Sequence, residues 1–309
     1  FKGDYAIEFR AYDEAAAYRF ISTRKGAYTV KNEISEYAFA GEPTVFCSYT
    51  RSNANKEFSE QYFNSFETPY VIEPMTKMGQ KRLMFLPVLV DMGDRKVCIT
   101  ETDLTSYPGM YLYNSNNDNT LESHYAPVPD KIKQGGHNML QGLVESRKPY
   151  IAEVEGERSF PWRICIVANN DAELLDDDMV FRLSHENVIG DTSWIKPGKV
   201  AWEWWNHWGL TGVPFKAGIN TETYNYYTDF AAKYGIEYVI LDESWAVKYA
   251  NDLKQVIPEV DLKAIVDHAN SKGVGIILWA GYNAVKGKEE EVCRHFAEMG
   301  VKGFKVDFL

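Results

Sequence analysis

The chain has little positive charge for its size. Only 33 Lys and Arg residues stand against 44 Asp and Glu residues, so the formal net charge over 309 residues is -11. A surface of this sign repels a phosphate backbone, and nucleic acid is therefore not an expected partner. Long apolar runs are also missing, so we predict no membrane-spanning helix. The first residues lack the charged start and apolar middle of a signal peptide, and we expect the chain to begin inside a domain.

Cysteine is scarce, and the four cysteines, Cys47, Cys98, Cys165 and Cys293, are far apart. Their spacing fits neither a zinc site nor a disulfide-dense scaffold, so we interpret them as small core residues. The sequence contains no His-Glu-x-x-His motif, no Gly-x-Ser-x-Gly motif and no phosphate-binding glycine loop. These absences disfavour a metalloprotease, an esterase and a nucleotide-binding protein.

Aromatic side chains, by contrast, are plentiful: 20 Tyr, 16 Phe and 8 Trp. Together with the acidic balance they indicate a neutral ligand bound through flat apolar faces, although the same side chains could equally fill a core.

Up to about residue 195 the apolar residues recur with period two. The segments that read as strands include 5–12, 17–22, 83–90 and 96–100. Many short strands with few helical stretches predict a β-sandwich or barrel-like domain. Residues 114–137, rich in Asn, Pro and Gly, are expected to form a long surface excursion.

After residues 196–199 the pattern becomes an alternation of strands and helices. Strands are predicted at 200–202, 236–241, 273–279 and 303–307, with helices over about 221–234, 260–272 and 287–299. Asp261 is suited to cap the second of these helices. The repeat length is typical of a (β/α)8 barrel, which needs about 250 residues and eight strands.

We therefore predict two domains, a β-sandwich over 1–197 and the first four βα units of a (β/α)8 TIM-type barrel over 198–309. A half barrel would leave a strand edge unpaired. Both domains are accordingly expected to be truncated, and a chain limited to these residues is expected to be inactive.

In such barrels the working residues lie where strands end. Lys305 and Asp307 are two positions apart on one strand and so share a face. The lysine could hold Asp307 ionised as a nucleophile, or the two could form a structural ion pair. The pair Asp242 and Glu243 could bind sugar hydroxyls or cap the following segment. Trp204 and Trp279 could stack on sugar rings or belong to the core.

Several stretches of the sequence resemble glycoside hydrolase family 97, whose members pair an N-terminal β-supersandwich with a (β/α)8 barrel. The matching stretches, in order along almost the whole chain, are residues 15–20, 99–110, 158–163, 204–206, 218–221, 238–243 and 303–308. In this family, retaining members similar to α-galactosidases carry an aspartate nucleophile at the end of the fourth strand. Inverting members, similar to α-glucosidases, lack it, and Asp307 matches the retaining pattern.

The resemblance implies attack of Asp307 on the anomeric carbon, with a second carboxylic acid protonating the leaving oxygen. That acid is expected beyond Leu309. The substrate-binding residues are predicted to be Trp204, Asn206, Asp242, Glu243, Trp279 and Lys305. The family also implies a Ca2+ ion held mainly by carboxylates from later strands, with Glu60 as the ligand from the first domain, unless Glu60 is simply solvated.

The sequence thus predicts a retaining α-glycoside hydrolase, in first place an α-galactosidase acting on terminal α-linked galactose of an oligo- or polysaccharide. The alternatives are an inverting α-glucosidase of the same family and a non-catalytic carbohydrate-binding module. The resemblance implies a bacterial periplasmic or secreted protein. The sequence leaves the oligomeric state open.

Overall fold

The computed structural model describes residues 3–50, 57–63, 67–79 and 81–308. The chain divides into two compact units, one formed by residues 1–130 and 147–188 and the other by residues 131–146 and 189–309. This division differs from the predicted boundary between residues 197 and 198, because residues 131–146 make their contacts within the second unit. We describe each unit by itself.

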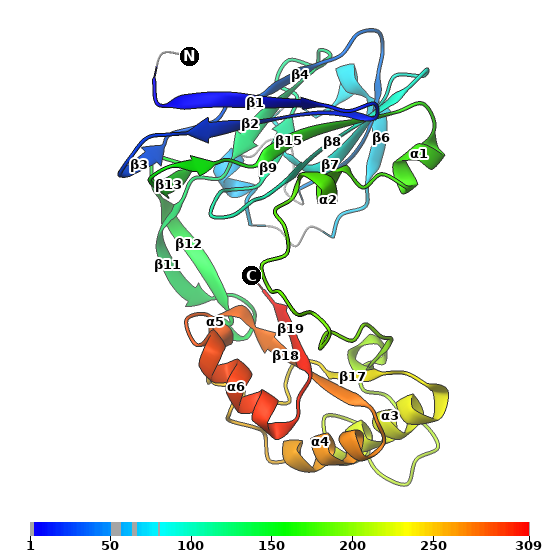
Figure 1. Cartoon of the computed structure of the whole chain (residues 1–309). Coiled ribbons are helices and arrows are strands. Elements are labelled where there is room, and N and C mark those ends of the chain that lie inside the picture. The colour runs from blue at the N-terminus through cyan, green and yellow to red at the C-terminus, as the bar shows by residue number, and fades with distance from the viewer. Residues whose placement is uncertain (1–2, 51–56, 64–66, 80, 309) are drawn as a thin grey trace. The chain divides into compact units, whose positions relative to one another are not determined.

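The first unit is built on an 11-stranded sheet (Figure 1). Its path runs β1-β2-β15-β8-β7-β9-β10-β4, with β14 beside β2 and with β5 and β6 joined at β7. The strands are β1 (Tyr5–Ala11), β2 (Ala15–Ser22), β4 (Glu36–Ala38), β5 (Thr44–Tyr49), β6 (Val71–Pro74), β7 (Met84–Asp91), β8 (Lys96–Thr102), β9 (Met110–Tyr113), β10 (Thr120–Tyr125), β14 (Arg158–Ser159) and β15 (Trp162–Ala168). Two further strands, β3 (Ala27–Val30) and β13 (Ala152–Glu155), pair with each other. Neighbouring strands of this sheet, such as β1 and β2, β8 and β15, and β5 and β7, pair antiparallel, as the period-two pattern predicts for a sheet with one buried face.

Short helical turns complete the first unit: η1 (Phe58–Glu60), η2 (Met75–Lys77), α1 (Asp171–Leu175) and α2 (Met179–Leu183). The expected surface excursion at residues 114–137 is wrong, because this segment contains the strands β10 and β11 (Pro129–Gly135). Its Asn-rich part is a short turn in which Asn114 accepts backbone hydrogen bonds from Asn116 and Asn117.

Alternating burial forms the core of the first unit. In β5, the side chains of Val45, Cys47 and Tyr49 point inward while their neighbours are only half-buried. All four cysteines are free thiols. The core interpretation holds for Cys47 but is wrong for Cys293, which is exposed on a helix of the second unit.

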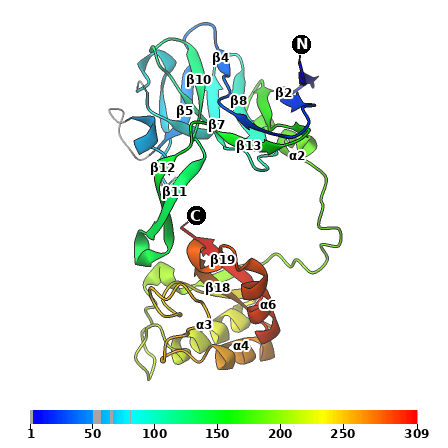
Figure 2. The same cartoon turned by 90° about the vertical axis from the view of Figure 1, so that its left-hand side faces the viewer.

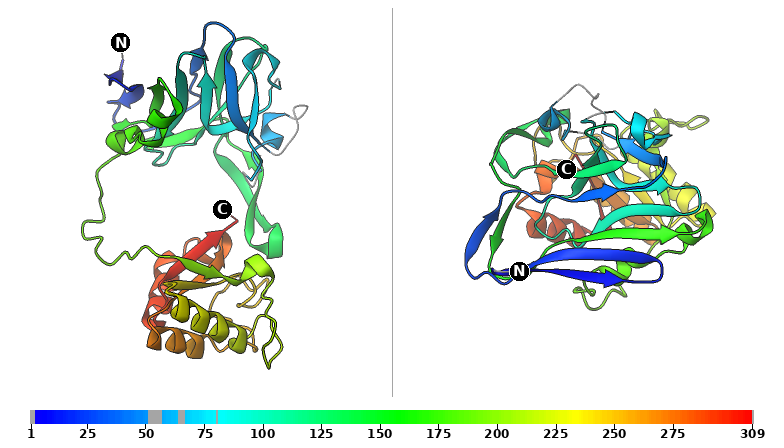
Figure 3. Two further views of the ribbon diagram at one scale, coloured as in Figure 1. Left: turned by 90° about the vertical axis from the view of Figure 1, so that its right-hand side faces the viewer. Right: turned by 90° about the horizontal axis from the view of Figure 1, so that it is seen from above.

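The second unit contains a four-stranded parallel sheet in the order β16-β17-β18-β19. The strands are β16 (Val200–Trp202), β17 (Tyr238–Leu241), β18 (Gly275–Gly281) and β19 (Gly303–Asp307). The helices α3 (Thr221–Tyr234), α4 (Leu262–Ser271) and α6 (Glu289–Met299) lie on one side of the sheet (Figure 3). These βα units confirm the predicted alternation of strands and helices.

Local sequence explains where these helices begin. The side chain of Asn220 accepts a hydrogen bond from Thr223 N, and that of Asp261 accepts one from Ala264 N at 3.0 Å, as predicted for a cap. Two of the strands are followed by short helical elements: η4 (Glu203–Asn206) after β16 and α5 (Tyr282–Val285) after β18. Among the described residues, no helix has the length and apolar character needed to cross a membrane.

The strands β11 and β12 (Gln141–Arg147) form a β-hairpin with the turn η3 (His137–Met139) at its tip (Figure 2). Residues 131–146 of this hairpin belong to the second unit. Its tip requires glycine at position 136: the backbone has φ +66°, and a Cβ atom there would lie 1.7 Å from Gln141 Oε1. The hairpin touches the parallel sheet closely, since a Cβ atom on Gly281 would lie 2.6 Å from Leu140 Cβ. The hairpin tip is therefore held at the end of β18.

Candidate active site

The carboxyl ends of the parallel strands bring together side chains that are far apart in the sequence. Asp307 ends β19, and Asp242 directly follows β17. The strand register sets Trp279 of β18 beside Lys305, and Gly281 beside Asp307. Polar groups at this edge of a parallel sheet are placed as in enzymes built from βα units.

Lys305 lies between the two aspartates. Its Nζ is 3.0 Å from Asp242 Oδ2 and 3.4 Å from Asp307 Oδ2. The same ammonium group lies 4.6 Å from the ring centroid of Trp202, whose Nε1 donates to Asp242 Oδ2 at 2.6 Å. One ammonium group therefore interacts with two carboxylates and with the face of the Trp202 ring.

Asp307 combines exposure with ionisation. Its side chain is 42% exposed, and its oxygens accept hydrogen bonds from Phe308 N at 2.9 Å and Trp279 Nε1 at 3.2 Å. Partial burial favours the protonated form, but these hydrogen bonds and the charge of Lys305 outweigh it and hold the pKa of Asp307 below its ordinary value. A carboxylate that is ionised, oriented and accessible has the properties of a nucleophile.

Asp242 has a different environment. Its side chain is only 3% exposed, one oxygen is engaged by Lys305 and Trp202, and the other accepts the N–H of Glu243 at 2.8 Å. In this arrangement the buried carboxylate of Asp242 orients the ammonium group of Lys305.

A buried carboxyl group that the sequence did not single out supports Asp242. Glu203, the first residue of η4, is fully buried, and its Oε1 accepts the backbone N–H of Asp242 at 2.7 Å and Trp208 Nε1 at 3.1 Å. Burial raises the pKa of Glu203 to about 7; the Asp242 N–H opposes this shift and the charge of Asp242 adds to it. In the sequence Glu203 lies within a run of tryptophans, and this pattern indicates the aromatic side chains rather than the carboxyl group.

The hairpin tip adds groups that sequence reasoning also missed. His137 Nε2 lies 2.6 Å from Glu243 Oε2, and Asn138 Nδ2 donates to the same oxygen at 3.2 Å. The His137 ring stacks on Phe308, with centroids 4.8 Å apart, and Phe308 follows Asp307 directly. The adjacent glycines 135 and 136 were the available signal, because they mark a tight tip at which a polar side chain can be presented.

The other predicted residues divide into two groups. Trp204 is partly exposed and stacks on Trp202, whereas Trp279 is 5% exposed and serves mainly as the hydrogen-bond donor to Asp307. Asn206 donates to Gly209 O and accepts from the Tyr227 hydroxyl, so its side-chain amide is engaged away from the aspartates. The structure thus brings together Asp307, Lys305, Asp242 and Trp279, with Glu243 beside the hairpin tip.

Glu60 lies in the first unit, where it is exposed at the end of η1. Its Oε2 accepts the N–H of Glu57 at 3.0 Å, which closes a capping box. In the part of the chain that the structure describes, no three His, Cys, Asp or Glu side chains gather as metal ligands. Glu60 alone does not make a calcium site, because such a site takes six to eight oxygen ligands.

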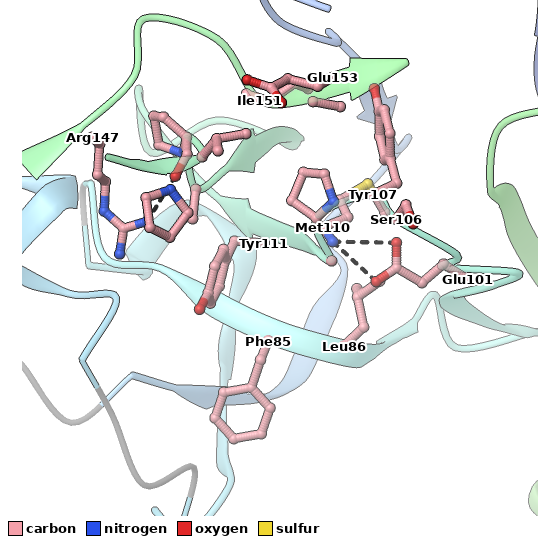
Figure 4. Close-up of a pocket in the computed structure, with 17 residues that line it drawn as sticks. Phe85, Leu86, Glu101, Ser106, Tyr107, Met110, Tyr111, Arg147, Ile151 and Glu153 are labelled. Atoms are coloured by element: carbon pink, nitrogen blue, oxygen red, sulfur yellow. Dashed lines mark hydrogen bonds between the residues drawn. The ribbon is translucent and has the colours of Figure 1, made fainter. Parts of the chain in front are cut away.

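The first unit also has a cavity of about 650 Å³, lined among others by Phe85, Tyr107, Tyr111 and Arg147 (Figure 4). Two glutamates line it, Glu101 and Glu153, and both oxygens of Glu101 accept the N–H of Met110 (Figure 4). None of the predicted site residues lines this cavity.

A parallel βα sheet with an ionised, accessible aspartate at the carboxyl end of a strand has the arrangement of an enzyme site built from βα units. Comparison with family models specifies the family. The glycosyl-hydrolase 97 N-terminal model matches residues 1–185, and the glycoside hydrolase 97 model matches residues 204–309. The chain belongs to glycoside hydrolase family 97.

Curated relatives agree with this assignment. The chain is 52% identical over 310 residues to a retaining α-galactosidase of Bacteroides thetaiotaomicron, a match that covers 100% of this chain and 47% of the relative. It is 26% identical to a probable retaining α-galactosidase of Streptomyces bingchenggensis, covering 100% of this chain and 44% of that protein. The chain therefore spans about half the length of the curated relatives it matches.

Solved structures show the same fold. A variant of a glycoside hydrolase family 97 enzyme from Pseudoalteromonas sp. strain K8 matches with a TM-score of 0.78 at 20% identity, over 99% of this chain and 45% of that one. A β-arabinopyranosidase matches with a TM-score of 0.73 at 22% identity, over 98% of this chain and 47% of that one.

Proposed function

We propose that the full-length protein is a retaining α-galactosidase and that Asp307 is its nucleophile. The observation that carries this proposal is the state of Asp307 itself, a 42% exposed carboxylate whose pKa is lowered by Phe308 N–H, Trp279 and Lys305 despite partial burial. The 52% identity to a retaining α-galactosidase supports the choice of galactose.

The reaction is a double displacement. An oxygen of Asp307 bonds to the anomeric carbon while the bond to the leaving oxygen breaks, and that oxygen takes a proton from a carboxylic acid elsewhere in the full-length protein. Water then attacks the glycosyl ester, the same acid, now a base, removes its proton, and Asp307 is released as carboxylate. Each Asp307 oxygen accepts one hydrogen bond from Phe308 N or Trp279, so lone pairs remain for the attack.

The remaining residues bind and orient. Lys305 keeps Asp307 ionised, and Asp242 holds Lys305 in place. Glu243, His137 and the partly exposed Trp204 offer hydrogen bonds and an aromatic face to a sugar. Asn206 is assigned to the outer part of the same substrate site.

The wider architecture belongs to the same proposal. The four parallel strands are the first half of a (β/α)8 barrel, preceded by a β-sandwich domain over residues 1–197. Ca2+ is bound by carboxylates of the full-length protein, with Glu60 as one ligand. The substrate is a terminal α-galactoside of an oligo- or polysaccharide, and the enzyme works in the periplasm or outside the cell.

The test is Asp307→Gly in the full-length protein. We expect hydrolysis of an aryl α-galactoside to fall by about 10⁴-fold or more, and added azide to restore turnover with release of β-galactosyl azide, because azide replaces the missing nucleophile on the opposite face. Asp94→Gly, at an exposed turn of the first unit, is the matched control.

Three results would contradict the proposal. Undiminished hydrolysis by Asp307→Gly would remove this residue from the mechanism. A wild-type product of inverted configuration, observed by NMR during the first turnovers, would favour the inverting α-glucosidase, and absence of any glycosidase activity would favour a carbohydrate-binding module.

A further inference from the structure

Glu203 is a buried carboxyl group without a cation. It follows β16 and is fully buried, and one oxygen accepts both the backbone N–H of Asp242 and the indole N–H of Trp208. Among the ion pairs of the described residues none includes Glu203, and the ammonium group of Lys305 is shared between Asp242 and Asp307. A buried carboxylate without a cation costs far more free energy than a buried carboxylic acid.

The second oxygen, Glu203 Oε2, is buried and has no hydrogen-bond partner. The hydroxyl of Tyr224 on α3 is likewise buried without one, and the charge of Glu203 acts on it. The other titratable groups that interact with Glu203 are Asp242 after β17 and Tyr227 on α3, and neither carries a positive charge.

A proton on Glu203 removes the uncompensated buried charge. The neutral carboxyl group and the Tyr224 hydroxyl can still share one hydrogen bond, so two otherwise unpartnered buried atoms are served without a cation. The other oxygen remains an acceptor for Asp242 N and Trp208. The elevated pKa of Glu203, about 7, agrees with this protonated form at neutral and lower pH.

We propose that Glu203, as a neutral carboxylic acid bonded to Tyr224, is a positioning residue that fixes the backbone at Asp242 and thereby the orientation of Lys305 and Asp307. The inference rests on the proposed function of Asp307 as nucleophile. The path is short: Glu203 holds Asp242 N, the Asp242 carboxylate holds Lys305 Nζ, and Lys305 Nζ faces Asp307.

The first experiment compares Glu203→Ala with Glu203→Gln in the full-length protein. The substrate is 2,4-dinitrophenyl α-galactoside, whose leaving group needs no protonation, so kcat/KM reports the attack by Asp307 rather than the general acid. Glu203→Ala should lower kcat/KM by about 100-fold, the size expected for a misplacement of about 1 Å, with the inhibition constant of free galactose changed less than about threefold. Glu203→Gln keeps the acceptor oxygen and offers an N–H to Tyr224, so it should restore most of the lost kcat/KM. Glu222→Gln, exposed on α3, is the matched control.

The second experiment varies pH. In the wild type, ionisation of Glu203 above about pH 7 places a charge beside Asp242, so kcat on this substrate should fall there, while Glu203→Gln should extend the plateau to higher pH. Thermal unfolding gives a readout that needs no activity. A carboxyl with a raised folded pKa loses stability as pH rises from its unfolded value, so Tm of the wild type relative to Glu203→Gln should fall between about pH 4.5 and pH 7 and then level off.

The outcomes separate cleanly. A Glu203→Gln variant as impaired as Glu203→Ala, or a Tm difference that does not change with pH, would overturn the neutral form. Full activity in Glu203→Ala would overturn the positioning role, and if this variant fails to fold, the Gln variant and the Tm series decide. A wild type that hydrolyses no α-galactoside would sink the proposed function instead, and with it the catalytic half of this inference, while the Tm series still tests the proton on Glu203.

Discussion

The two units each hold a cluster of one cation and two carboxylates, and the clusters differ in almost every other respect. In the first unit, Arg163 binds Glu33 through two hydrogen bonds of 2.7 and 2.9 Å and also bonds to Glu101. All three side chains are at most 9% exposed, and the hydroxyls of Tyr107 and Tyr125 donate to the remaining positions on Glu33. Each oxygen of Glu33 therefore accepts two hydrogen bonds.

In the second unit, Lys305 replaces the planar guanidinium with a single point of charge, and the cluster is open on one side. Asp242 is 3% exposed and fully engaged, whereas Asp307 is 42% exposed. The first cluster saturates the oxygens of Glu33, whereas the second leaves a charged oxygen of Asp307 accessible, as the proposed nucleophile requires. Two carboxylates around one cation therefore indicate a reactive site only when the exposure of the carboxylates is known.

The largest effect is expected for a substitution of Arg163 in the first cluster. Arg163→Met should destabilise the protein by about 3–5 kcal/mol, because it leaves Glu33 and Glu101 buried without a counter-charge. Urea unfolding of the full-length protein measures this change. Arg95→Met, in an exposed pair with Asp94, is the control and should stay within about 0.5 kcal/mol. A loss below about 1 kcal/mol for Arg163→Met would mean that the first cluster is not structural.

The corresponding change in the second cluster should act on the reaction more than on the fold. Lys305→Met should lower kcat for an aryl α-galactoside by about 100-fold, because Asp307 loses its orienting charge. Loss of the charge should also move the acid limb of the rate profile to higher pH, since Lys305 helps to hold the pKa of Asp307 down. Lys302→Met, exposed just before β19, is the control. Unchanged kcat would place Lys305 among the structural ions.

The smallest effect is expected at the hairpin tip. His137→Ala should raise KM by about five- to tenfold with kcat changed less than about threefold, because it removes a partner of Glu243 without touching Asp307. Steady-state kinetics on an oligosaccharide measures both constants. Lys133→Ala, in the exposed pair with Glu145 on the same hairpin, is the control. A fall in kcat alone would show that the tip acts on the reaction step.

The strands and helices of the second unit could be predicted from sequence because their apolar periods are strong and their caps are local. The predicted helix 221–234 has the same limits as α3, and Asp261 caps α4. Lys305 and Asp307 could be placed on one face for the same reason, since alternation along one strand is a local property.

Other features depend on contacts between distant segments, which no local pattern reports. The meeting of His137 with Glu243 joins residues 106 positions apart, and the support of Asp242 by Glu203 joins residues 39 positions apart. Sequence order places residues 131–146 within the predicted first domain, although their contacts are with the second unit.

The mixed ownership of residues 131–146 bears on how this enzyme family can diversify. A chimera that exchanges residues 198–309 between two relatives would carry over the aspartates but leave the recipient's His137 and Asn138 facing foreign strand ends. If the proposed function holds, small insertions or replacements within this short loop would change sugar preference while every residue of the parallel βα sheet stays the same. Searches for the origin of substrate preference in such relatives should therefore include sixteen positions that precede the parallel sheet in the sequence.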